Sequence, residues 1–107
     1  MATVKVNERG TNLGTRSDGR EIRNQIINEI NKGEKVFLDF SEVEMISGSF
    51  ADECLGIMIA ERGFDFVKNN ISIKNSNPSV TLVWKQTMKN RLRNPSPVSS
   101  KRMGSVA

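Results

Sequence analysis

Histidine is absent from this sequence of 107 residues, and cysteine occurs once, at Cys54. Without histidine, neither a histidine-based catalytic triad nor most kinds of zinc site can be built. A single cysteine cannot form a disulfide within the chain, which is typical of a reducing, cytoplasmic environment. Because Cys54 has no histidine to act as its base and no complete catalytic set is present, we expect a protein without enzymatic activity, metal or cofactor.

Long apolar runs are also missing. No stretch approaches the roughly 18 consecutive apolar residues of a membrane-spanning helix. The first ten residues, MATVKVNERG, lack the apolar core of a signal peptide, so we expect neither membrane insertion nor secretion. With 107 residues and an apolar fraction of 36%, the chain is long enough for one domain with a small core.

Acidic residues are absent from the last third of the chain. Residues 1–65 contain 8 Lys and Arg and 12 Asp and Glu, whereas residues 66–107 contain 8 Lys and Arg and no acid. A basic segment can contact nucleic acid or an acidic protein surface, or it can simply be solvated. Aromatic side chains that could stack on bases are limited to Trp84. The residues that would bind nucleic acid are Lys85, Lys89, Arg91, Arg93, Lys101 and Arg102.

The first third of the chain predicts a strand, a loop and a helix. Residues 3–6 alternate weakly between polar and apolar, as in a short edge strand. Residues 10–20 contain three glycines and predict a loop. In the helix that follows, Ser17 or Asp18 would cap the first turn, and Gly33 would end the last one at about residue 32. The apolar stripe of this helix consists of Ile22, Ile26, Ile27 and Ile30.

The middle of the chain predicts a buried strand, a turn and a buried helix. Residues 35–40, KVFLDF, are β-branched and aromatic, as in a strand. Residues 50–60 form too long a run, and one too rich in Ala, Leu and Met, for a strand, and they predict a helix. Ser47 or Ser49 would cap that helix, and Asp52 in its first turn would favour the positive helix end.

The last third predicts further helical turns at 64–70, a half-buried strand at 71–75 and a final helix from Asn77-Pro78 to about residue 94. Residues 95–107 have Pro, Ser and Gly but no apolar period, and they predict a flexible basic tail after a domain of residues 1–94. The apolar face of the final helix would consist of Val80, Trp84, Met88 and Leu92.

Strands and helices therefore alternate along the chain. This order predicts a small α/β sandwich, in which a central sheet of three to four strands has helices packed against it. Residues 36–40 would form the central strand, with residues 4–6 and 71–73 on either side. Parallel neighbours are expected, because the helices between the strands are long enough to make the crossovers.

The turn before the second helix is the main candidate site. Capping alone accounts for a serine there, but a hydroxyl at a helix start can also accept a phosphate, which the helix end stabilises. Asp52 and Glu53 point about 100° apart on a helix and cannot form a paired-carboxylate site by themselves. A planar guanidinium could grip either carboxylate. The candidate partners are Arg16, Arg20 and Arg23. The loop at residues 14–20 could also cup an anion, although it lacks the P-loop and dinucleotide patterns.

Residues 38–51, LDFSEVEMISGSFA, resemble the core signature of STAS domains, the fold of anti-sigma factor antagonists. Three motifs, TRS at 15–17, LDF at 38–40 and FADE at 50–53, more closely resemble a STAS-like family of unknown function, over about residues 10–92. This resemblance implies a protein-interaction switch, often found alongside ATPases of the histidine-kinase type. By position, Ser49 matches the phosphorylated serine of the antagonists. Ser47, Gly48 and Phe50 replace an aspartate, a serine and a glycine of their pattern.

Our hypothesis is a cytoplasmic, non-enzymatic module that binds a partner protein, such as a kinase-like ATPase or another regulator. The alternative is a nucleic-acid-associated regulator that uses the basic helix and tail, and self-association is left open. The residues expected to bind the partner are Ser47, Ser49, Phe50, Asp52 and Glu53, with Arg16 and Arg20 nearby.

Overall fold

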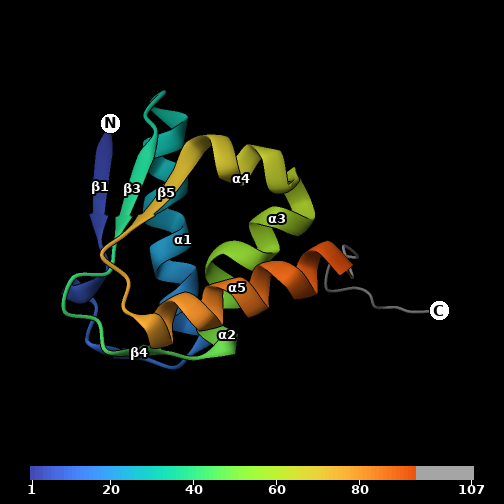
Figure 1. Cartoon of the computed structure of the whole chain (residues 1–107). Helices are drawn as coiled ribbons and strands as arrows, with labels where there is room; N and C mark the ends of the chain where they lie inside the picture. Colours follow the sequence, from blue (N-terminus) through green and yellow to red (C-terminus); the bar gives the residue numbers. More distant parts are fainter. Residues whose placement is uncertain (94–107) are drawn as a thin grey trace.

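The computed structural model describes residues 1–93 and contains a parallel sheet of three strands. β1 (Ala2–Lys5), β3 (Val36–Asp39) and β5 (Ile71–Lys74) lie in the order β1-β3-β5 (Figure 1). β3 pairs in parallel with both neighbours. The predicted α/β fold class and the predicted central strand are therefore confirmed.

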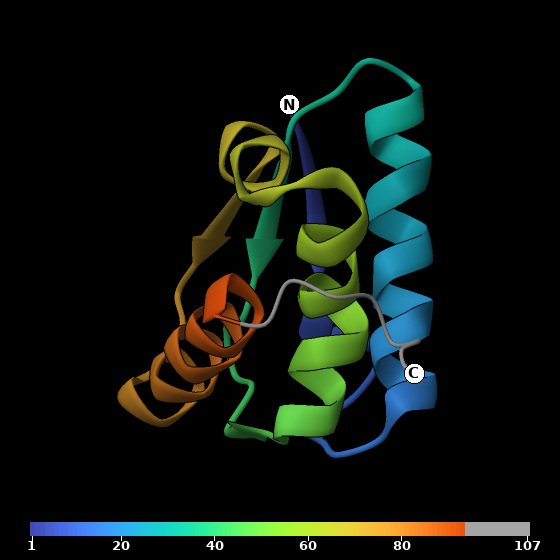
Figure 2. The same cartoon turned by 90° about the vertical axis from the view of Figure 1, so that its right-hand side faces the viewer.

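The two faces of this sheet differ in polarity. Val4, Leu38 and Ile73 share one row of the register and point to the same side, where Val4 and Leu38 are buried. Helices pack on that side, and Figure 2 views the molecule from it, with the strands behind. On the other face, Asp39 lies between Lys5 and Lys74 in the register, and Lys74 covers the ring of Phe37, so this face is mostly polar.

Four helical segments surround the inner face. The second of them is one continuous helix whose middle turn is π-helical. The helices are α1 (Arg16–Asn31), α2 (Gly48–Ala51), the π-helical turn η2 (Asp52–Gly56), α3 (Ile57–Arg62), α4 (Phe64–Asn70) and α5 (Pro78–Arg93). No helix among residues 1–93 is long and apolar enough to cross a membrane.

The ends of α1 confirm one expectation and correct another. Gly33 has a φ of 86° and follows the C-cap, as predicted for a residue that must adopt the left-handed region. The prediction that Ser17 or Asp18 caps the helix was wrong. Thr15 is the N-cap, and its hydroxyl accepts a hydrogen bond of 3.1 Å from the amide of Asp18. The carboxylate of Asp18 is instead held by the Arg9 guanidinium at 2.8 Å.

Two short elements were not predicted. β2 (Asn12–Leu13) and β4 (Met45–Ile46) pair in parallel, within segments that were expected to be loops. Two residues in each strand are too few to show an alternating pattern. Residues 6–8, of which the first was expected to end the edge strand, form the 3-10 turn η1 (Val6–Glu8).

The buried face of α5 differs from the predicted one. Val80 and Trp84 are buried, but Leu92 is 56% exposed, so its assignment to the apolar face was wrong. Residues four apart drift by about 40° around a helix at each step, which places position 92 about 120° from position 80. Position 91 lies only about 20° away, and Arg91 is the residue that is buried there.

The core lies between the sheet and the helices. Trp84 of α5 sits at its centre, with its ring 5.4 Å from that of Phe40 and 6.3 Å from that of Phe50. The fully buried side chains include Ile22 and Ile26 from α1, Val36 and Leu38 from β3, and Leu55 and Met58 from the second helix. The predicted boundary between a domain of residues 1–94 and a tail of residues 95–107 lies outside the described residues.

Candidate functional site

Of the two serines at the start of the second helix, one caps the helix and the other is exposed to solvent. The hydroxyl of Ser47 accepts a hydrogen bond of 3.0 Å from the amide of Phe50 and donates one of 2.9 Å to the carbonyl of Gly14. Ser47 therefore caps the helix and also ties it to the loop before α1. Ser49 is exposed, and Phe50 points into the core. Of the two predicted caps, the structure selects Ser47.

The carboxylate of Asp52 forms ion pairs with two arginines, Arg91 and Arg16. Arg91 grips it with two hydrogen bonds, Nε to Oδ1 at 2.8 Å and Nη2 to Oδ2 at 3.0 Å. Arg16 approaches Oδ2 at 3.3 Å from the opposite side. Burial acts to raise the pKa of Asp52, but the bonds from Arg91 and Arg16 outweigh it, so the pKa lies below its usual value. Asp52 is therefore ionised at neutral pH.

Glu53 completes a chain of ion pairs across the helix start. Its carboxylate lies 3.2 Å from Arg16 and 3.1 Å from Arg23, and Arg23 also donates to the backbone carbonyl of Glu53. Arg16 and Arg23 thus act as the partners expected for the two carboxylates. Arg20 is exposed and makes no ion pair with any residue of the described part of the chain.

Two glycines allow these contacts to be so close. A Cβ atom at Gly19 of α1 would lie 2.6 Å from the carbonyl oxygen of Phe50, so only glycine lets α1 approach the second helix this closely. A Cβ atom at Gly56 would overlap the carboxylate of Asp52. Both positions are buried. The ion-pair network therefore depends on small residues on its inner side.

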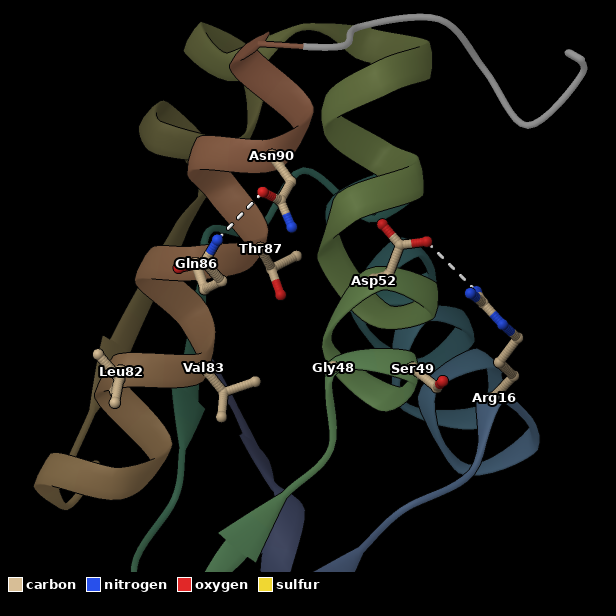
Figure 3. A pocket seen from close by; sticks show the side chains of 9 residues that line it. All are labelled: Arg16, Gly48, Ser49, Asp52, Leu82, Val83, Gln86, Thr87 and Asn90. Atoms are coloured by element: carbon tan, nitrogen blue, oxygen red, sulfur yellow. Dashed lines mark hydrogen bonds and ion pairs between the residues drawn. The ribbon is translucent and has the colours of Figure 1, made fainter.

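A groove of about 580 Å³ runs between the second helix and α5 (Figure 3). Ser49 and Asp52 lie on one wall, and Arg16 lies beside them on the side away from α5. On the α5 wall, Val83 and Thr87 project into the groove in the same view. The groove thus brings part of the predicted partner-binding turn opposite a helix that sequence analysis had not placed there.

The rim of the groove on α5 is polar and exposed. The side chain of Gln86 donates a hydrogen bond of 3.2 Å to that of Asn90 (Figure 3). Leu82 lies at the end of this wall and is 67% exposed. A second molecule that covered this exposed leucine would be stabilised there, because the contact removes apolar surface from water.

The basic residues of α5 fall into two groups. Lys85, Lys89 and Arg93 are exposed, whereas Arg91 is buried and paired with Asp52. Trp84, the expected stacking residue, is only 1% exposed. Lys101 and Arg102 lie outside the described residues. Nothing in the described part of the chain favours nucleic-acid binding over the other uses of a basic surface.

Sequence analysis missed the role of Arg91. The signal was present as spacing, since Val80, Trp84, Thr87 and Arg91 recur every three or four residues, and these four are the buried positions of α5. A charged residue in such a stripe requires a partner of opposite charge, which the sequence does not identify.

The remaining chemistry of the described residues is limited. Cys54 is fully buried, and burial raises the pKa of its thiol, so the thiol is protonated and shielded from reagents. No group of three or more acidic or cysteine side chains within residues 1–93 is arranged to hold a metal ion.

Comparison with known families gives a match over much of the chain. A family model described as a STAS-like domain of unknown function (DUF4325) matches residues 18–81, which is more than half of the chain. The matched region contains the central strand, the helix start with Asp52 and Glu53, and the first turn of α5, whereas Arg16 and Arg91 lie outside it. No curated protein and no solved structure gives a match.

Proposed function

Because the chain belongs to the family of STAS-like domains of unknown function, we propose that it is a non-enzymatic regulatory module of the cytoplasm. It binds a partner protein through the turn and helix start at residues 47–53. The partner is a kinase-like ATPase or another regulator. The observation that supports this most is the groove of about 580 Å³ that this turn forms with α5.

The turn is suited to binding because it is held in place before any partner arrives. The hydroxyl of Ser47 is committed to two hydrogen bonds, and the carboxylates of Asp52 and Glu53 are held by arginines from two other helices. A fixed surface loses little conformational entropy on association, which favours affinity. Within the turn and helix start at residues 47–53, only Gly48 and Ser49 are exposed.

Phosphorylation of Ser49 would switch this surface. The hydroxyl of Ser49 is exposed, whereas that of Ser47 both donates a hydrogen bond to Gly14 and accepts one from Phe50. A phosphate adds a charge of about −1.5 to −2 and three acceptor oxygens. Arg16 lines the same groove, is 54% exposed on its side chain, and is shared between Asp52 and Glu53. The phosphate would compete for Arg16 and change the charge of the groove, so binding of the partner would depend on it.

The test replaces one of two exposed serines by arginine. Ser49→Arg places a long side chain in the groove, and Ser72→Arg makes the same change on the outer face of the sheet. Each full-length variant is used to capture partners from extracts of the source cells, and captured proteins are quantified by mass spectrometry. Affinity for the purified partner is then measured by calorimetry.

We expect Ser49→Arg to weaken binding of the partner at least tenfold and Ser72→Arg to leave it unchanged. Equal binding by both variants, with melting temperatures like that of the parent, would overturn the proposal. For the switch, the purified ATPase and ATP are added to the parent, Ser49→Ala and Ser47→Ala. A phosphate that remains on the Ser49→Ala variant would exclude Ser49 as the acceptor.

A further inference from the structure

We propose that the segment of the partner that occupies the groove is acidic and carries a large aliphatic side chain. This inference rests on the proposed function and specifies its ligand. It follows from the charges on the two walls and from the exposed leucine at one end.

The α5 wall is flanked by positive charge. Lys85, Lys89 and Arg93 are all exposed and follow one another at intervals of four residues, so they form a stripe on one side of the helix. They do not line the groove itself, and the stripe runs beside its rim on the outer side of α5, next to Leu82. α5 contains no acidic residue that could pair with them. At a rise of about 1.5 Å per residue, the stripe extends over about 12 Å. A chain with carboxylates at a matching spacing would be attracted along its length.

The carboxylates of the groove do not cancel this attraction. Asp52 is held by Arg91 and Arg16, and Glu53 by Arg16 and Arg23. Three guanidinium groups thus face two carboxylates, which leaves this cluster with a positive charge. The arginine cluster on one wall and the basic stripe beside the rim of the other therefore both favour an acidic ligand, and both would repel a basic segment.

The apolar part of the ligand is defined by Leu82. This side chain is 67% exposed at the end of the groove, and the half-buried Val83 lies next to it. An aliphatic side chain placed there would bury apolar surface on both molecules. From Leu82 to Asn90 the groove wall extends about 12 Å, the length of about four extended residues or two helical turns.

Nucleic acid fits this surface less well than a peptide does. Single strands bind on exposed aromatic rings, and Trp84 is buried in the core. A phosphate backbone would gain from the lysines but not from the exposed leucine.

The experiment selects ligands without assuming a sequence. The full-length protein is used to enrich a phage library of random dodecapeptides, and the enriched peptides are synthesised and their affinities measured by fluorescence anisotropy. We expect enriched peptides to have a net negative charge and at least one Leu, Ile or Met. Enrichment of neutral or basic peptides, or of none, would overturn the inference.

Two matched double variants locate the binding surface. Lys85→Glu/Lys89→Glu reverses the stripe, and Lys35→Glu/Lys68→Glu makes the same change in net charge at two exposed lysines elsewhere. The first is expected to weaken peptide binding at least tenfold and the second less than twofold. Similar losses in both would show an effect of overall charge only. A random-sequence DNA duplex that bound as tightly in the same salt, with the same dependence on Lys85 and Lys89, would assign the surface to nucleic acid instead.

The outcomes separate this inference from the proposed function. If Ser49→Arg abolishes partner binding while Lys85→Glu/Lys89→Glu leaves it intact, the groove binds a partner that is not acidic. If acidic peptides bind through the stripe while Ser49→Arg has no effect on the partner, the turn at residues 47–53 is not the partner's contact.

Discussion

Asp52 and Arg91 form a bidentate ion pair between the start of the second helix and the last turn of α5, although they lie 39 positions apart in the chain. The two residues belong to the two helices that flank the groove that we propose as the binding site, and Asp52 lines it. Their ion pair therefore joins these two helices directly. Gly56 leaves the space for both side chains, because a Cβ atom there would overlap the carboxylate of Asp52 and lie 3.3 Å from Nε of Arg91.

Removing one member of this pair should be costly. Arg91→Met keeps an apolar stem in the core but leaves the carboxylate of Asp52 with only Arg16. Breaking a buried pair typically costs about 3–5 kcal/mol, and because Asp52 is partly exposed we expect a loss near 3 kcal/mol in the free energy of unfolding. Urea unfolding of the purified variants measures it.

A second variant separates the lost attraction from the remaining unpaired charge. Asp52→Leu/Arg91→Met removes both charges, and we expect it to be more stable than Arg91→Met, because no carboxylate then remains without its partner. Asp52→Leu alone is measured as well. If the double variant were less stable than Arg91→Met by the full loss that Asp52→Leu causes in the parent, the two residues would not be coupled.

The stability of the protein should fall in acid partly because of Asp52. Its pKa is lowered in the folded state, so its contribution is fully present above the usual value of about 3.9 and is lost as the pH falls through the lower folded value. We expect the advantage of the parent over Asp52→Asn to be constant from pH 7 to about pH 5 and to shrink below it. Asp18 and Asp39 also have lowered pKa values, but they are the same in both proteins and cancel.

Two helix glycines should respond to alanine with opposite signs. At Gly19 the new Cβ atom would meet the backbone carbonyl of Phe50, and overpacking of this kind costs about 1–3 kcal/mol. At Gly48 the Cβ atom would meet nothing within 4 Å, so the helix preference of alanine should raise stability by up to about 1 kcal/mol. Thermal unfolding of Gly19→Ala and Gly48→Ala compares them. Equal shifts would contradict the close approach of α1 to the second helix.

The two serines of the turn should differ in how much their replacement by alanine lowers stability. Ser47→Ala removes the cap of the second helix and the hydrogen bond to Gly14, and we expect a loss of about 1–2 kcal/mol. Ser49→Ala removes an exposed hydroxyl and should change stability by less than about 0.5 kcal/mol. Chemical denaturation of both variants tests this. A loss at Ser49 equal to that at Ser47 would show that the cap had been assigned to the wrong residue.

The elements of the fold were predictable because their signals are local. The β-branched run at 36–40, the alternation at 71–74 and the isoleucine spacing of α1 each follow from the geometry of a single strand or helix. The motifs at 15–17, 38–40 and 50–53 also pointed to the STAS-like family that the family match supports. A sequence pattern identifies such features because every residue involved lies within a few positions of the others.

The candidate site depended on contacts that no local pattern contains. Sequence analysis left the cap open between Ser47 and Ser49, and the hydrogen bond from Ser47 to the distant Gly14 decided it. It extended the apolar face of α5 to Leu92, whereas the turn of the helix buried Arg91 opposite Asp52. The sequence by itself determined which of the longer segments are strands and helices, since periodicity reports which face of each is apolar. Only the tertiary structure decided which charges pair and where a groove lies, because these depend on how the segments pack in space.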